Sequence, residues 1–197
     1  MTAPRTHGPR ERMVFAAAQL IRRDGVGATG MRDVAARAEA PRGSLQHYFP
    51  GGKEQLVNEA VTWAGRYAGK RVARYLAELP DPTPGALFEA MTWQWIAEFE
   101  ADGFGTGCPV AAATVDSTAT LPSAREATAA AFAAWTTPLT AALTTLRVPA
   151  ARAPGLATLM ISTLEGAILM ARAHQSTAPL VTVTTELAPL LDAAAAA

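Results

Sequence analysis

Apolar residues recur at intervals of three and four along most of the chain, which is the spacing of one face of an α-helix. The first such stripe is formed by Met13, Ala16, Ala17, Leu20 and Ile21. Glycines, prolines and short polar runs separate one stripe from the next. The pattern predicts an all-α protein, with helices over about residues 9–24, 31–38, 42–49, 53–79, 85–100, 108–117, 122–146, 156–174 and 187–197.

Periodicity alone does not assign the structure of two segments. Residues 181–185 (VTVTT) alternate like a β-strand, but no second strand is available to pair with them, so we expect helix or loop. Residues 153–171 form the longest apolar stretch, borderline in length for a membrane span. Glu165 lies near its middle, where a carboxylate is costly in lipid. We therefore expect a buried helix there.

The first three predicted helices are short, and a tight turn joins the second to the third, as in a helix-turn-helix. Leu45 and Phe49 form the apolar side of the third helix. Its other side carries hydrogen-bonding side chains that suit base edges and phosphates, namely Arg42, Ser44, Gln46, His47 and Tyr48. Lys53 begins the next helix, whose free N–H groups and ammonium predict a phosphate contact.

Charge is distributed unevenly, although the formal net charge is zero. Residues 1–53 carry nine basic and four acidic side chains, whereas residues 54–197 carry eight basic and thirteen acidic ones. A basic N-terminal part on an acidic remainder suggests a polyanionic partner. The uneven charge distribution, taken alone, is explained equally well by two helical regions with differently charged solvent-exposed surfaces.

Residues 27–57 read GATGMRDVAARAEAPRGSLQHYFPGGKEQLV, and they resemble the DNA-binding part of TetR-type transcriptional repressors. The resemblance extends over about residues 10–60. GCPVAA at 107–112 and LEGAILMAR at 164–172 resemble the LmrA/YxaF-like branch, less specifically. The resemblance implies nine or so helices, with a DNA-binding domain at 1–52 and a ligand-binding and dimerisation domain at 53–197. It places Arg42, Ser44, His47 and Tyr48 towards DNA and Lys53 on phosphate.

Three positions depart from the family pattern. Gln46 stands where the family usually has tyrosine, which predicts a different base preference. Glu39 stands where the family usually has glycine, which predicts strain if the backbone there is left-handed. Gly30 replaces the usual Ser or Thr cap, and we expect Thr29 to take over that phosphate contact.

Aromatic residues gather in the part of the chain after Lys53. An ordinary core explains each one alone, but the set also predicts an apolar ligand pocket. The residues predicted to line it are Trp63, Tyr67, Phe88, Met91, Trp95, Phe99, Phe104, Cys108, Phe132, Trp135, Met160, Leu164, Glu165 and Ile168.

Cys108 is the single cysteine, so the chain forms no internal disulfide, which suits a reducing cytoplasm. It follows a glycine loop at a predicted helix start, where a thiol is either reactive or simply buried. Glu165 could pair with Arg172, bind a cationic ligand or bond across a dimer. No HExxH, CxxC, P-loop or GxGxxG motif occurs, so we expect no metal and no cofactor.

Together these features predict a ligand-responsive repressor rather than an enzyme. It would bind a two-fold symmetric DNA operator as a homodimer formed by the last two helices, and a small apolar or aromatic effector would release it. Two alternatives remain open: an all-helical enzyme that uses Cys108 as its nucleophile, and a sequence-neutral DNA-binding protein.

Overall fold

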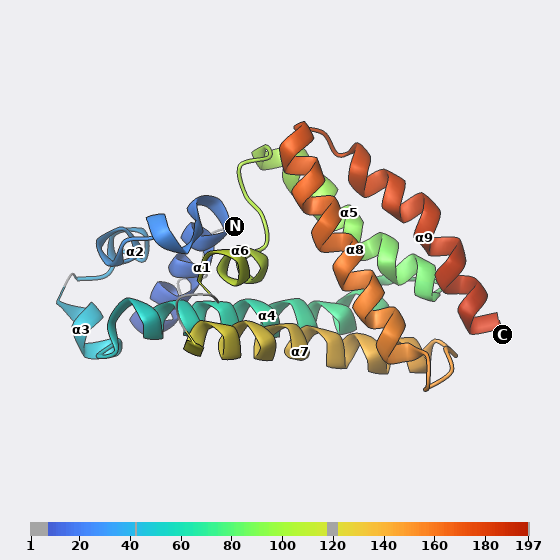
Figure 1. The fold of residues 1–197 in the computed structure, drawn as a ribbon, viewed down its shortest axis with the longest axis horizontal. Coiled ribbons are helices and arrows are strands. Elements are labelled where there is room, and N and C mark those ends of the chain that lie inside the picture. The colour runs from blue at the N-terminus through green and yellow to red at the C-terminus, as the bar shows by residue number, and fades with distance from the viewer. Residues whose placement is uncertain (1–7, 42, 118–121, 197) are drawn as a thin grey trace. The chain divides into compact units, whose positions relative to one another are not determined.

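The computed structural model describes residues 8–41, 43–117 and 122–196, and the regular structure in these ranges is entirely α-helical (Figure 1). The helices are α1 (Pro9–Ala28), α2 (Met31–Arg37), α3 (Ser44–Tyr48), α4 (Gly52–Glu78), α5 (Pro84–Asp102), α6 (Pro109–Ser117), α7 (Pro122–Thr145), α8 (Ala153–His174) and α9 (Ala178–Ala196). The all-α prediction is confirmed.

The last helix starts nine residues before its predicted beginning, so α9 includes the VTVTT segment. Leu180 is fully buried there, and the hydroxyl groups of Thr184 and Thr92 on α5 lie 2.7 Å apart. The Thr184 and Thr185 hydroxyls also donate to carbonyls one turn earlier, at Leu180 and Val181. Packing against α5 therefore outweighs the weak strand preference of this segment.

The first helix breaks at the predicted glycine but continues beyond it. Gly25 has φ 82° and ψ 171°, a conformation essentially restricted to glycine, and helical geometry then resumes as far as Ala28. This kink redirects the chain shortly before α2 begins.

The chain forms two compact units, each assembled from two separate stretches. The first comprises Met1–Arg66 and Cys108–Phe132, and in it α6 packs along α1 while α2 packs on α1. Its fully buried side chains include Met13, Ile21, Phe49 and Leu56. Apolar burial of this kind is what stabilises a short three-helix arrangement.

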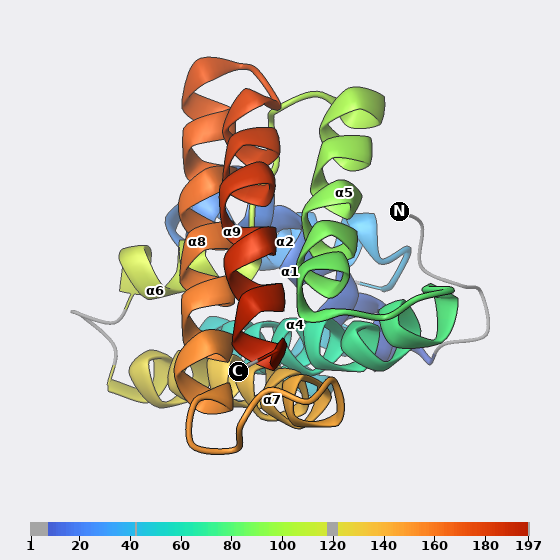
Figure 2. The ribbon, with the colours of Figure 1, turned by 90° about the vertical axis from the view of Figure 1, so that its right-hand side faces the viewer.

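The second unit comprises Tyr67–Gly107 and Ala133–Ala197, and in it α9 packs against α5 and α8 (Figure 2). Asp192 on α9 accepts the Gly85 N–H at 2.7 Å. A Cβ at Gly85 would come within 2.7 Å of the Ala188 carbonyl, so the helices approach closely there. The carboxylate also sits at the N-terminus of α5, where negative charge is favoured.

Glycines also let α4 approach α7 within each unit. In the first unit a Cβ at Gly65 would lie 2.4 Å from the Ala131 carbonyl oxygen. In the second, a Cβ at Gly69 would lie 2.3 Å from the Ala134 carbonyl oxygen. Any larger residue at either position would push the two helices apart.

Helix α8 is long and apolar enough to cross a membrane by length and composition alone. In this structure, one side of it is a buried stripe that includes Ala157, Met160, Leu164 and Ile168. That periodic burial is typical of a helix that covers a protein core, as expected from the sequence.

Candidate nucleic-acid interface

Helix α2 ends in a left-handed turn at Glu39, where φ is +50°. The Glu39 N–H donates to the Ala36 carbonyl at 3.1 Å, and the Ala40 N–H donates to the Ala35 carbonyl at 3.0 Å. These two bonds form a Schellman motif, whose left-handed position is usually glycine. The left-handed backbone on which the predicted strain depends is thus present, and a glutamate occupies it.

Helix α3 is held by its apolar side, as the sequence predicted. Leu45 and Phe49 are buried, and the Arg10 guanidinium lies 5.5 Å from the centre of the Phe49 ring. Arg12 on α1 donates from Nε to the Ala38 carbonyl at 3.0 Å, which ties α1 to the end of α2. The turn and α3 are therefore anchored through their inner side.

The outer side of α3 presents polar side chains. Gln46 and His47 are exposed and Tyr48 is half-buried, with its ring 5.0 Å from the His47 ring. The Ser44 hydroxyl donates to the Pro41 carbonyl at 2.5 Å, which helps to start the helix. Arg42, the fifth predicted contact on this helix, lies outside the described residues. Polar groups held on a small rigid helix can reach base edges.

Two of the predicted phosphate contacts have internal partners. Thr29 is buried, and its hydroxyl donates to the Gly25 carbonyl at 2.7 Å, so this bond steadies the kink of α1. The Lys53 ammonium donates to the Gly27 carbonyl at 3.1 Å, and the residue as a whole is half-buried. Both side chains thus converge on the last turn of α1, and their phosphate contacts stay predictions.

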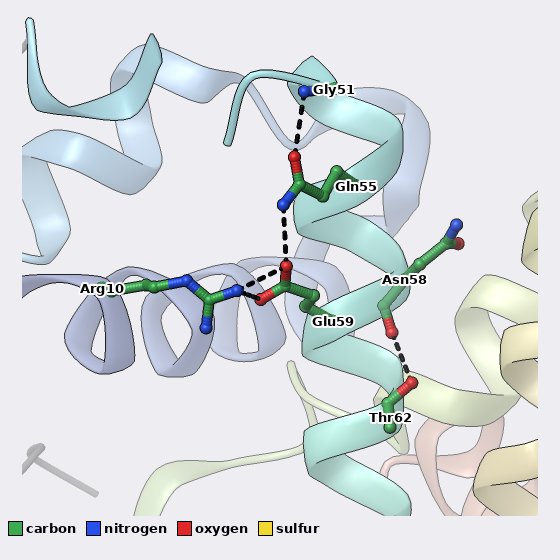
Figure 3. A network of polar contacts seen from close by, with 6 residues as sticks. All are labelled: Arg10, Gly51, Gln55, Asn58, Glu59 and Thr62. Atoms are coloured by element: carbon green, nitrogen blue, oxygen red, sulfur yellow. Dashed lines mark hydrogen bonds and ion pairs between the residues drawn. The ribbon is translucent and has the colours of Figure 1, made fainter. Parts of the chain in front are cut away.

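A polar network fixes the first turns of α4 (Figure 3). Gln55 accepts the Gly51 N–H at 2.9 Å and donates to Glu59 at 2.9 Å. Arg10 from the start of α1 forms an ion pair with Glu59 at 2.6 Å. The network orients the helix that begins next to Lys53.

The kink of α1 has one further partner, from α6. An Asp116 carboxylate oxygen accepts the Val26 N–H at 2.8 Å. A Cβ at Gly25 would lie 2.4 Å from that same oxygen, so only glycine leaves room for the contact. Asp116 was not predicted from the sequence, because nothing in the local pattern pairs it with a backbone group 90 positions earlier.

Known proteins similar to this chain identify its family. The profile of the bacterial regulatory proteins of the tetR family matches residues 14–60, and that of the LmrA/YxaF-like transcriptional regulator C-terminal domain matches residues 84–186. An HTH-type transcriptional regulator of Mycobacterium tuberculosis is 40% identical over 189 residues, covering 93% of this chain and 94% of that protein. The chain belongs to the TetR family of transcriptional regulators.

Two further comparisons agree with this assignment. The HTH-type transcriptional regulator LmrA of Bacillus subtilis is 28% identical over 184 residues, covering 92% of this chain and 96% of that protein. A TetR transcriptional regulator structure from Legionella pneumophila shares the fold at 18% identity, with a TM-score of 0.80, covering 95% of this chain and 100% of that one. The family resemblance seen in the sequence is confirmed.

The residues predicted to line a ligand pocket of this TetR-family protein are divided between the two units. Trp63, Cys108 and Phe132 belong to the first unit, and the others belong to the second. Trp63 stacks edge-on against Phe15 at 5.4 Å. Cys108 is buried just before α6, which agrees with a packing role for this thiol.

In the second unit most of the predicted pocket residues are core residues. The side chains that are at most 7% exposed are Phe88, Met91, Phe99, Trp135, Met160, Leu164 and Ile168. Half-buried ones are Tyr67, Trp95, Phe104 and Glu165. Trp95, Phe99 and Phe104 form a continuous row, with ring centres 5.9 and 5.0 Å apart. The half-buried side chains are the ones that an incoming ligand could reach without displacing the core.

Of the three roles considered for Glu165, pairing with Arg172 does not occur in this unit. Arg172 donates to the carbonyls of Phe104 at 3.3 Å and Gly105 at 3.4 Å, so it anchors the glycine-rich loop before α6 instead of pairing with Glu165. A Cβ at Gly107 would lie 2.9 Å from the Arg172 guanidinium, so a larger residue there would require this side chain to shift. Within the described residues, no group of three or more His, Cys, Asp or Glu side chains is arranged to hold a metal ion.

Proposed function

We propose that this TetR-family regulator is a ligand-responsive repressor that binds a two-fold symmetric operator. The observation that carries the proposal is the outer side of α3, where Gln46 and His47 are exposed while Leu45 and Phe49 hold the helix from within. The base-reading set would be completed by Ser44, Tyr48 and the undescribed Arg42, and Lys53 would serve a flanking phosphate. Thr29 would contact a phosphate only by turning its hydroxyl away from the Gly25 carbonyl.

Residues 1–52 would act as the DNA-binding domain and residues 53–197 as the ligand-binding and dimerisation domain. The Lys53 ammonium donates to the Gly27 carbonyl at 3.1 Å. A phosphate would offer this ammonium a charged acceptor in place of a neutral carbonyl, and a charged acceptor makes the stronger hydrogen bond. The ammonium is therefore already placed beside the last turn of α1 when DNA arrives.

The dimer would form through the outer sides of α8 and α9. Opposite its buried stripe, α8 exposes Leu159, Leu169 and Met170 at 44, 55 and 53%. Val181 and Leu190 on α9 are exposed at 50 and 66%. Such apolar side chains on neighbouring helices suit an isologous two-fold contact. Two recognition helices would then meet half-sites about 34–36 Å apart, or a multiple of that spacing.

A small apolar or aromatic effector in the second domain would release the DNA. Its contacts would be the half-buried Tyr67, Trp95 and Phe104 together with the other predicted pocket residues of the second unit. Effector and DNA would then weaken each other's binding by the same coupling free energy, which is typically about 1–3 kcal/mol. Such a protein acts in the cytoplasm, where it meets the chromosome.

The test begins by selecting DNA fragments that the purified protein binds, which yields the operator. Lys53→Ala should weaken binding to every sequence alike and reduce the salt slope by roughly one unit, because one phosphate contact is lost. Gln46→Ala should instead change the preferred sequence, by about 1–3 kcal/mol if its contact is bidentate. The matched control is Lys70→Ala, because Lys70 is an exposed lysine later on the same helix. This variant should change neither the DNA affinity and its salt slope nor the preferred sequence.

Failure of the selection to enrich any sequence would favour the sequence-neutral DNA-binding alternative and refute the repressor proposal. An unchanged affinity and salt slope in Lys53→Ala would refute the phosphate assignment. The enzyme alternative would require a catalysed reaction that Cys108→Ser abolishes.

A further inference from the structure

Arg71 lies between two tyrosines on the second half of α4. Tyr67, Arg71 and Tyr75 are spaced four residues apart and therefore share one side of the helix. The guanidinium carbon lies 5.7 Å from the Tyr67 ring centre and 5.0 Å from the Tyr75 ring centre. One guanidinium nitrogen also donates to the Tyr67 hydroxyl at 3.2 Å. The two rings thus hold the cation in one orientation.

This side of α4 faces α5 within the second unit. The hydroxyl of the buried Tyr75 donates to the Gln94 side chain on α5, and Trp95 is the next residue. Trp95 begins the aromatic row that continues through Phe99 and Phe104. Arg71 therefore places a positive charge between two tyrosine rings, in the unit that also contains this aromatic row.

No acidic side chain among the described residues forms an ion pair with Arg71, and its Nε is buried without a hydrogen-bond acceptor. Arg74, three residues later, is exposed and paired with Glu78 at 2.7 Å. Tyr75 does not supply the missing charge, because burial raises the pKa of its hydroxyl and keeps it neutral. Arg71 as a whole is half-buried, and a guanidinium that is partly withdrawn from water normally has a carboxylate or phosphate partner.

We propose that Arg71 is the anchor for an anionic group of the effector, and that the effector is an aromatic carboxylate. A planar carboxylate matches the fork of N–H donors that a guanidinium presents, and an attached ring suits the tyrosine and tryptophan surfaces. This inference rests on the proposed function, and it assigns the effector a negative charge, which the sequence left open. The i, i+4, i+8 pattern of Tyr, Arg and Tyr was the available sequence signal.

The test compares aromatic carboxylates with their neutral amides, using the full chain. The probes are benzoate, 1-naphthoate and 9-anthracenecarboxylate, each paired with its primary carboxamide and titrated by quenching of tryptophan fluorescence at constant ionic strength. We expect at least one carboxylate to bind about tenfold more tightly than its amide, because the charge-assisted pair is lost in the amide. Arg71→Gln should remove that preference while amide binding persists, which shows that the variant is folded.

Arg74→Gln is the matched control, since it removes an outward-facing arginine from the same helix and should leave the preference unchanged. Arg71→Lys should retain part of the preference for the carboxylate, because the positive charge stays but the planar pair of guanidinium N–H donors is lost. The proposal is overturned if no carboxylate is preferred to its amide, or if Arg71→Gln keeps the full preference.

Operator binding in the presence of the preferred carboxylate separates this inference from the proposed function. Release of DNA from the wild-type protein, but not from Arg71→Gln, supports both. An Arg71-dependent carboxylate preference without any effect on DNA supports the anion site and contradicts ligand-controlled repression.

Discussion

At the scale of single residues, the chain places non-glycine residues where helices end in left-handed turns. Glu39, Arg147 and Gln175 all have positive φ, between 50° and 70°. A residue with a Cβ destabilises the folded state by roughly 1–2 kcal/mol in this conformation. Replacing it with glycine removes that cost, but glycine loses more conformational entropy on folding, which offsets part of the gain. We predict that Glu39→Gly raises the free energy of unfolding by about 0.5–1 kcal/mol and the Tm by about 1–4 °C, measured by thermal and urea unfolding.

The matched control for that substitution is Glu39→Gln, which removes the charge and keeps the Cβ. If the glutamine variant gains as much stability as the glycine variant, the gain comes from charge and the backbone explanation is wrong.

At the scale of elements, the contact between α6 and the kink of α1 depends on two residues together. Gly25→Ala should cost about 1–3 kcal/mol, because its backbone conformation suits only glycine and the new Cβ meets Asp116. Asp116→Ala removes the acceptor of the Val26 N–H and relieves that clash. We predict that the double variant is more stable than the sum of the single losses implies, by at least about 0.5 kcal/mol, in urea unfolding.

Asp192→Ala provides the matched comparison, since Asp192 accepts the Gly85 N–H in the second unit and shares no partner with Gly25. The stability lost in Asp192→Ala should add to the stability lost in Gly25→Ala when the two substitutions are combined. If the stability losses of Gly25→Ala and Asp116→Ala also add in their double variant, the Asp116 carboxylate does not restrict the residue at position 25.

At the scale of the whole molecule, the outer side of α8 would decide whether the protein assembles. Leu169 is 55% exposed on that side, and a charge placed there would be buried without a partner in the proposed dimer. We predict that Leu169→Glu is a monomer by light scattering at micromolar concentration and loses operator affinity. Val115→Glu introduces the same charge at an 81% exposed position on α6 and should remain dimeric. A wild-type monomer would contradict the proposal outright.

The sequence by itself determined the helices and the kind of DNA-binding unit. Helical periodicity is a local property, so residue spacing alone predicts the stripe at Met13, Ala17 and Ile21 and the inward Leu45 and Phe49. The sequence also marked Gly25 as a break in the first helix, whereas the backbone conformation at Gly25 and the left-handed backbone at Glu39 come from the structure.

Only the tertiary structure decided which polar groups meet. Thr29 faces inward and bonds to the Gly25 carbonyl, and Asp116 reaches the Val26 N–H. Arg71 lies between two rings, and none of the ion pairs among the described residues involves it. Hydrogen bonds and ion pairs act over a few ångströms in space, and their strength depends on burial, so sequence spacing cannot assign them. The early start of α9 has the same origin, because its packing on α5 comes from residues about 90 positions away.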